Sequence, residues 1–160
     1  MRAQGGGVVN FETSVTIERS VDEVFDYVSD PRNFPGWNSA VQAVRQTSPG
    51  TDGVGATYSM VRELPGGRAE NDLEVLALRR PTEFDIRTTS GPTPFVYRYR
   101  FTDEGGTTLV ALAAEVELGG LAGALGPLAS RAVKRGVDSN FADLKRILEE
   151  VAGDPASGFA

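Results

Sequence analysis

The chain has 160 residues, 40% hydrophobic and 24% charged, enough for one globular domain that buries about 70% of its unfolded surface and encloses a cavity. Its net charge of −6, from 22 acidic and 16 basic residues, argues against nucleic acid and anionic membrane surfaces as partners. The absence of cysteine and histidine excludes disulfides, catalysis by Cys or His, and zinc or histidine-ligated iron sites, so no cofactor is expected.

The sequence predicts no membrane insertion, because no apolar run approaches the roughly 20 residues of a membrane span. Its Gly-rich N-terminus lacks a hydrophobic signal core, which is typical of a cytoplasmic protein. We expect flexible tails at residues 1–8 and 153–160 and a single domain over 9–152, present as a monomer or homodimer.

The first predicted element is a strand over Val9–Ile17, where apolar and polar residues alternate. A helix follows, because Ser20 and Glu23 have the spacing of a capping box. Asp30-Pro31 ends this helix. Its apolar face consists of Val21, Val24, Phe25 and Val28.

The middle of the chain begins with a short helix or tight turn in residues 32–39, which carries the only tryptophan, Trp37. Six strands follow, joined by turns rich in Gly, Pro and Asp, as antiparallel hairpins require. They are predicted at Val41–Gln46, Ala56–Leu64, Arg68–Leu78, Glu83–Thr89, Pro94–Thr102 and Thr107–Leu118.

The last element is a long helix over Pro127–Val151, whose apolar residues recur every three or four positions. Its basic residues come early and its acidic residues late, against the helix dipole, so packing must hold it. The apolar stripe is Val133, Val137, Phe141, Leu144, Leu148 and Val151. The order of elements predicts an α+β fold: an antiparallel sheet of about seven strands with its helices on one side.

Two motifs carry a family resemblance: VTIERSVDEVFDYVSDP at residues 15–31 and FPGW at 34–37. They resemble the polyketide cyclase/dehydrase and lipid-transport family of the START-like (SRPBCC) superfamily. The resemblance implies a helix-grip fold, in which a curved sheet wraps round the C-terminal helix, two short helices follow the first strand, and an apolar cavity lies between. Members bind lipids, sterols or polyketides, and some are cyclases or dehydratases. They share no catalytic motif.

Four aromatic residues would share one face of a strand: Phe95, Tyr97, Tyr99 and Phe101. They form either a cavity wall, where tyrosine hydroxyls orient a ligand, or ordinary core beneath the last helix.

Neighbouring strands add residues to the same face: Tyr58, Met60 and Arg62; Asn71, Leu73 and Val75; Phe84, Ile86 and Thr88. Arg62 and Asn71 would bring polar atoms into an apolar interior. A buried arginine is costly unless it is paired or faces a ligand anion. The simpler interpretation is that Arg62, near the end of its strand, reaches solvent.

Three further features have two interpretations each. Glu70, Asp72 and Glu74 share a strand face and indicate either acid–base chemistry or a solvated outer face paired with Arg87, Arg98 and Arg100. Gly136, inside the last helix, makes room for a ligand or for close packing against the sheet. The glycine-rich segment 119–126 is a lid over the cavity or a plain connector.

The leading hypothesis is a protein that binds a small hydrophobic molecule between the sheet and the last helix. The alternatives are a cyclase or dehydratase that uses tyrosine and arginine, with Tyr58, Tyr97, Tyr99 and Arg62 as first suspects, and a protein-interaction module. The predicted ligand-binding residues are Trp37, Tyr58, Met60, Arg62, Asn71, Leu73, Phe84, Tyr97, Tyr99, Gly136 and Asn140.

Overall fold

A computed structural model describes residues 7–50, 53–64, 66–119 and 126–153 of the chain. The elements are β1 (Val8–Ile17), α1 (Val21–Val28), the 3₁₀ helix η1 (Pro31–Asn33), α2 (Phe34–Trp37), β2 (Val41–Gln46), β3 (Thr57–Leu64), β4 (Gly67–Arg79), β5 (Glu83–Ser90), β6 (Phe95–Asp103), β7 (Thr108–Glu117) and α4 (Pro127–Gly153). Their types and order confirm the predicted α+β class, and their bounds differ from the predicted ones only at the ends. β1 begins at Val8, inside the segment that we expected to be a tail.

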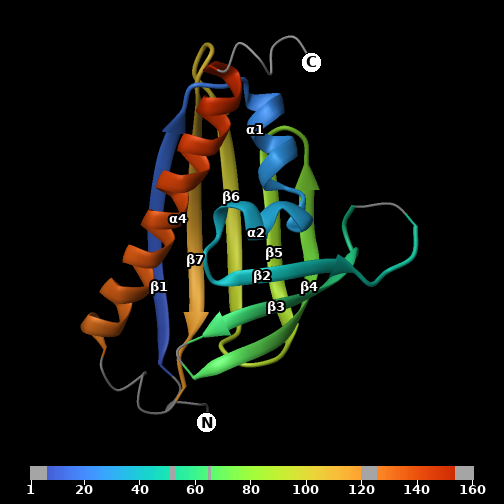
Figure 1. Cartoon of the computed structure of the whole chain (residues 1–160), viewed down its shortest axis with the longest axis vertical. Coiled ribbons are helices and arrows are strands. Elements are labelled where there is room, and N and C mark those ends of the chain that lie inside the picture. Colours follow the sequence, from blue (N-terminus) through green and yellow to red (C-terminus); the bar gives the residue numbers. More distant parts are fainter. Residues whose placement is uncertain (1–6, 51–52, 65, 120–125, 154–160) are drawn as a thin grey trace.

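The strands form one seven-stranded antiparallel sheet in the order β1-β7-β6-β5-β4-β3-β2. Strands β2 to β7 follow one another as neighbours, while β1 pairs with β7 over its whole length, from Val8 opposite Glu117 to Ile17 opposite Thr108. Figure 1 shows α1, α2 and α4 on one face of the sheet, with β2 and β3 crossing the direction of β6 and β7. This arrangement confirms the predicted helix-grip fold.

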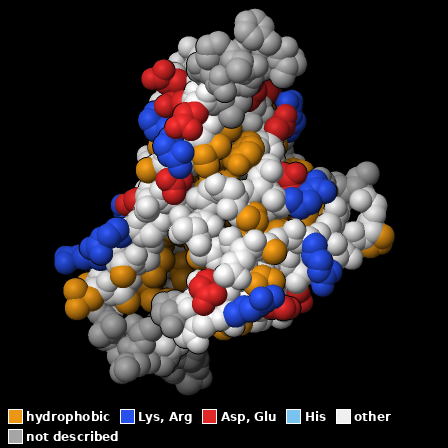
Figure 2. All heavy atoms as spheres, in the orientation of Figure 1, with side chains coloured by type: hydrophobic (Ala, Val, Ile, Leu, Met, Phe, Trp, Pro, Cys, Tyr) orange, Lys and Arg blue, Asp and Glu red, His pale blue; other side chains and the backbone are white. Residues whose placement is uncertain are grey.

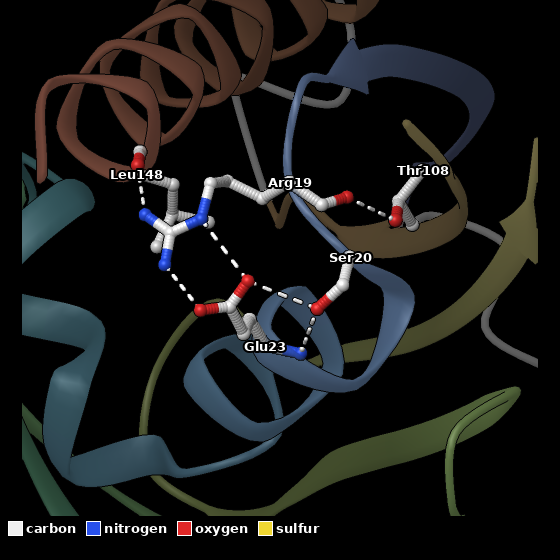
Figure 3. A network of polar contacts seen from close by, with 5 residues as sticks. All are labelled: Arg19, Ser20, Glu23, Thr108 and Leu148. Carbon is white, nitrogen blue, oxygen red and sulfur yellow. Dashed lines mark hydrogen bonds and ion pairs between the residues drawn. The ribbon is translucent and has the colours of Figure 1, made fainter. Parts of the chain in front are cut away.

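The start of α1 is fixed to the end of α4 by a polar network (Figure 3). Ser20 accepts a hydrogen bond from the Glu23 backbone N–H at 3.3 Å, as the capping box predicts. The Glu23 carboxylate in turn accepts from the Ser20 hydroxyl at 2.9 Å, in place of the Ser20 backbone N–H. Arg19 forms an ion pair with Glu23, and its Nη1 donates to the Leu148 carbonyl oxygen at 2.7 Å. Arg19 therefore joins the first turn of α1 to a carbonyl near the end of α4.

The two halves of α4 differ in their contact with the sheet. In the C-terminal half, Phe141, Leu144 and Leu148 are buried in the core, whereas Val133 and Val137 in the N-terminal half are only partly buried. Further hydrogen bonds secure the C-terminal half: Lys145 Nζ donates to the Thr16 carbonyl oxygen and the Glu149 carboxylate accepts from the Glu18 backbone N–H, both at 2.8 Å. The helix is thus held firmly at one end, and space remains beneath the other.

The outer face of the sheet carries cross-strand ion pairs, which favours the solvated-face interpretation of the acidic residues on β4. Glu74 pairs with Arg87 at 2.9 Å, as predicted. Arg98 and Arg100 pair instead with Glu115 and Asp85, at 2.8 and 2.6 Å. Among the described residues, no helix is both long and apolar enough to cross a bilayer.

Candidate functional site

A cavity of about 160 Å³ lies between the N-terminal half of α4, the segment from α2 to β2, and strands β3 and β6. Figure 2 shows the molecule hollowed beside the N-terminal half of α4, with hydrophobic side chains inside the hollow. The cavity is lined by Phe34, Trp37, Asn38, Ala40, Val41, Met60, Arg62, Phe95, Tyr97, Tyr99, Val133, Gly136, Val137 and Asn140.

Strand β6 supplies the aromatic wall. Alternation puts Phe95, Tyr97, Tyr99 and Phe101 on the inner face, and the first three line the cavity. Their rings follow one another, with centroids 4.3 Å apart for Phe95 and Tyr97 and 6.2 Å for Tyr97 and Tyr99. Phe101 instead packs edge-to-face on Phe25 of α1 at 5.0 Å. Both interpretations of this run therefore hold, each for a different part of the strand.

The tyrosine hydroxyls in the wall make no hydrogen bond to any residue that the structure describes. Burial raises the pKa of Tyr97 to about 12, although the positive charge of Arg62 acts in the opposite direction. Burial and the neighbouring Tyr97 raise the pKa of Tyr99 well above its ordinary value. At neutral pH both phenols stay protonated, so each has a donor to offer to a molecule in the cavity.

Arg62 does not reach solvent, so the simpler interpretation of this residue is wrong. Its side chain turns inward from β3, and the residue is only 9% exposed. Nε donates to Asn71 Oδ1 at 2.9 Å, and Nη2 donates to the carbonyl oxygens of Pro92 and Thr93 at 2.9 and 3.0 Å. The guanidinium also lies over the Phe95 ring, 5.4 Å from its centroid. Burial lowers the pKa of Arg62, although nearby Tyr97 partly opposes this shift.

Asn71 supports Arg62 from behind instead of lining the cavity. Its Oδ1 accepts from Arg62, while its Nδ2 donates to the carbonyl oxygens of Ser90 and Pro92 at 3.0 and 2.9 Å. The β5–β6 loop packs closely over it: a Cβ on Gly91, whose φ is +97°, would lie 2.2 Å from the Glu70 carbonyl oxygen. Arg62 and Asn71 thus hold this loop together through four carbonyl contacts and one shared hydrogen bond.

Trp37 closes the cavity on the α2 side. Its ring packs edge-to-face on Phe34 at 5.9 Å and lies 6.2 Å from Phe141 of α4. The residue is 3% exposed, and its indole N–H has no hydrogen-bond partner among the described residues. It is the one fully buried side-chain donor or acceptor in the described part of the chain that lacks a partner.

Helix α4 contributes the opposite wall. Asn140 is buried, and its Oδ1 accepts hydrogen bonds from the backbone N–H and hydroxyl of Ser39 at 3.2 and 3.4 Å. Gly136 is exposed at the cavity, and a Cβ there would meet no atom within 4 Å. Gly136 therefore does not serve close packing against the sheet, which was one of our two interpretations; it leaves the cavity open. Ser139, one position before Asn140, is exposed.

The structure brings most of the predicted site residues together in this cavity: Trp37, Met60, Arg62, Tyr97, Tyr99, Gly136 and Asn140. Tyr58, Leu73 and Phe84 share the inner face but lie fully buried in the core, away from the cavity. Our prediction did not include the residues around α2 that line it: Phe34, Asn38, Ala40 and Val41. The FPGW motif was the available signal for this segment. Of the predicted lid, residues 120–125 lie outside the described residues.

A second hollow, about 490 Å³, lies over Ala111 and Ala113 on the outer face of the sheet. It is shallow, and the arginines at its rim, Arg98 and Arg100, are already paired with carboxylates. We take the inner cavity as the candidate site, because it is more enclosed and holds the buried side chains of Trp37 and Arg62.

The sheet, the long C-terminal helix and the cavity between them define a START-like helix-grip protein. Residues 8–149 match the family described as polyketide cyclase / dehydrase and lipid transport, and the chain belongs to that family. No curated protein matches it in sequence.

Solved structures share the fold at low sequence identity. A START superfamily protein from Mycobacterium smegmatis has a TM-score of 0.78 and 16% identity, with 89% of this chain and 98% of that chain covered. The Zhui aromatase/cyclase from a Streptomyces species has a TM-score of 0.75 and 13% identity, with 93% and 98% covered. A protein from Thermus thermophilus has a TM-score of 0.73 and 16% identity, with 86% and 94% covered.

Proposed function

We propose that this protein binds a small hydrophobic molecule in the cavity between the sheet and α4. The observation that carries the proposal is buried Trp37, which lines the cavity and whose indole N–H has no hydrogen-bond partner among the described residues. A buried donor without a partner costs about 1–3 kcal/mol, and an oxygen atom of a ligand would relieve that cost. The hydroxyls of Tyr97 and Tyr99, which have no hydrogen-bond partner among the described residues, add further donors on the wall that β6 supplies. Membership of a lipid-transport and cyclase family points the same way.

The cavity volume limits the size of the ligand. At about 160 Å³, it is close to the roughly 150 Å³ of an engineered cavity that holds one benzene molecule. A single ring or a short acyl chain fits without rearrangement. A molecule with several fused rings exceeds this volume, so it would extend out of the cavity or displace the N-terminal half of α4.

The test is to purify the protein natively, extract it with solvent and analyse the extract by mass spectrometry, together with thermal-shift titrations against one-ring aromatics and short acyl compounds. We expect a co-purifying hydrophobic compound or a saturable rise in Tm, since a ligand at 100 times its Kd adds about 2.7 kcal/mol. Gly136→Leu, which places a side chain in the cavity, should abolish the rise. Ala142→Leu, at an exposed position on the same helix, is the matched control and should keep it.

Either of two results contradicts the proposal: no extract component and no Tm shift across the panel, or equal shifts in wild type and Gly136→Leu. In the second case the ligand binds elsewhere.

A second candidate function, that of a cyclase or dehydratase, is favoured by the two protonated tyrosines that line the cavity together with Arg62. A phenol whose pKa is about 12 donates a proton or hydrogen bond to a carbonyl oxygen, whereas it cannot act as a base at neutral pH. Tyr97, Tyr99 and Arg62 would then polarise a substrate carbonyl while the cavity folds the chain. Tyr58, the fourth first suspect, does not line the cavity.

Tyr97→Phe tests this candidate, because it removes one hydroxyl and keeps the ring. With a short polyketide-like thioester as substrate, the enzyme hypothesis predicts that turnover falls about 100-fold, the loss typical of an acid–base group, with Kd for the product unchanged. Wild-type turnover in Tyr97→Phe would remove Tyr97 from the catalytic assignment.

The interaction-module alternative requires an exposed apolar patch. Large hydrophobic residues that are more than half exposed in the described chain are Val8, Val54 and Leu128. Val8 and the first turn of α4, which carries Leu128, border one hollow, whereas Val54 lies in the segment between β2 and β3. We therefore keep ligand binding first, and propose a cytoplasmic monomer or homodimer that binds no nucleic acid. Size-exclusion chromatography with light scattering tests the oligomeric state.

A further inference from the structure

Arg62 is a buried cation without a carboxylate partner among the described residues. Its three acceptors, on Asn71, Pro92 and Thr93, are all neutral oxygens. The other described arginines outside ion pairs are all exposed: Arg45, Arg68, Arg131 and Arg135. Within the described residues, Arg62 alone combines burial with an uncompensated positive charge.

Neutral acceptors satisfy the hydrogen bonds of a guanidinium but do not neutralise its charge. Taking the ion out of water costs more than such bonds return unless an opposite charge lies close by. The Phe95 ring face, 5.4 Å from Cζ, offsets part of that cost. The contacts use Nε and Nη2, so Nη1 has no acceptor among the described residues. Nη1 of this fixed, charged side chain is therefore available to donate to a ligand in the cavity that Arg62 lines.

Among the described residues, every other group that lines the cavity is neutral: aromatic rings, aliphatic side chains, Asn38 and Asn140. The anion that would complement Arg62 must therefore come from outside the lining. The volume of about 160 Å³ is enough to enclose an apolar group of about one ring.

We infer that the ligand is a small carboxylic acid with an apolar body of about one ring, whose carboxylate is bound by Arg62. This inference rests on the proposed function and narrows the class of ligand. The Asn71 amide and the Pro92 and Thr93 carbonyls act as positioning groups, because they fix the guanidinium without cancelling its charge. The indole N–H of Trp37 and the phenol of Tyr97 are further donors for a ligand oxygen.

The experiment compares three molecules with the same phenylpropyl skeleton by isothermal titration calorimetry at pH 7: 3-phenylpropanoate, its methyl ester and 3-phenylpropanol. The inference predicts that wild-type protein binds the acid at least about tenfold more tightly than the ester or alcohol, as expected for a hydrogen bond to a charged group. Arg62→Met keeps the length of the side chain and removes its charge. It should abolish the preference for the acid and leave the affinity for the alcohol within about threefold of wild type, since that variant loses no apolar contact of the ring.

Arg87→Met is the matched control, because Arg87 lies on the outer face in an ion pair with Glu74; all three affinities should stay at wild-type values. Wild-type protein that binds acid and alcohol equally well overturns the inference while the proposed function stands, and Arg62 is then only a structural link to the β5–β6 loop. Absence of binding by all three probes overturns the inference, and overturns the proposed function as well if the extract and the thermal-shift panel are also negative. If Arg62→Met does not fold, the affinities of wild-type protein for the acid, the ester and the alcohol still test the inference.

Discussion

Asn71 is the residue on which the geometry of Arg62 depends. Its side chain accepts one hydrogen bond from the guanidinium and donates two to the β5–β6 loop, all within 3.0 Å. It is 1% exposed, so water cannot replace these partners. Removing it leaves Arg62 Nε and two carbonyl oxygens with fewer partners inside the protein.

Asn71→Ala should therefore lower the free energy of unfolding by about 3 kcal/mol, the cost of stranding a buried charged donor together with lost hydrogen bonds. Urea denaturation followed by circular dichroism measures this. Asp72→Ala, one position along on the exposed face of the same strand, should change stability by no more than about 0.5 kcal/mol. Equal effects of the two substitutions would show that the Asn71 contacts contribute little.

At the scale of elements, the C-terminal half of α4 packs in the core, whereas its N-terminal half borders the cavity. Gly136 lies in the N-terminal half. A Cβ at this position meets no atom within 4 Å, and glycine in a helix interior is about 1 kcal/mol less favourable than alanine. Gly136→Ala should raise the free energy of unfolding by about 0.5–1 kcal/mol. Gly55→Ala is the contrast, since its surroundings are equally open but its φ is +89°, so alanine there should destabilise. Destabilisation by Gly136→Ala in the same urea assay would mean that the helix packs on the sheet at this point.

The contact between α1 and α4 gives a prediction about pH. Hydrogen bonds from Arg19 and Ser20 lower the pKa of Glu23 from its usual 4.5 to about 2. Because the folded pKa is lower than the unfolded one, the carboxylate stabilises the fold fully above about pH 4.5 and progressively less as the pH falls towards 2. The Glu23 side chain is 52% exposed, so solvent screening keeps the effect small.

Glu23→Gln should thus cost about 0.5–1 kcal/mol at pH 7, and the difference from wild type should vanish as the pH is lowered from about 4.5 to about 2. Stability curves at a series of pH values measure this. Glu12→Gln on the exposed face of β1 should show no comparable change. A Glu23→Gln difference that persists at the acid end of the series would rule out the charge as its cause.

At the scale of the whole molecule, alternation and helical periodicity predicted the elements and the face of each strand. Turns between strands determined the neighbours, and the family motifs at residues 15–31 and 34–37 pointed to the helix-grip fold. Neither alternation nor helical periodicity could show which residues of each inner strand face border the cavity. Phe84 and Tyr97 share the inner face, yet Phe84 is in the packed core and Tyr97 borders the cavity. Alternation along a strand does not show which part of its inner face the helices cover.

The buried environment of Arg62 could not be predicted from the sequence either. Its position near the end of β3 suggested solvent exposure, but the Pro92–Thr93 segment, about thirty residues further on, supplies the acceptors that hold it inside. Such a contact depends on the register of β3, β4 and β5 together. The residues around α2 were missed for a similar reason, since a short helix gives too little periodicity to show which side chains face inward.

The measurement that tests the central claim most directly uses Trp37, the only tryptophan, as a reporter inside the cavity. Its fluorescence is recorded while the protein is titrated with the hydrophobic compounds that raise Tm. The account predicts a saturable change in Trp37 emission at one ligand per chain, absent in Gly136→Leu and retained in Ala142→Leu. Compounds that raise Tm without changing Trp37 emission, or that act equally on Gly136→Leu, would contradict binding in this cavity.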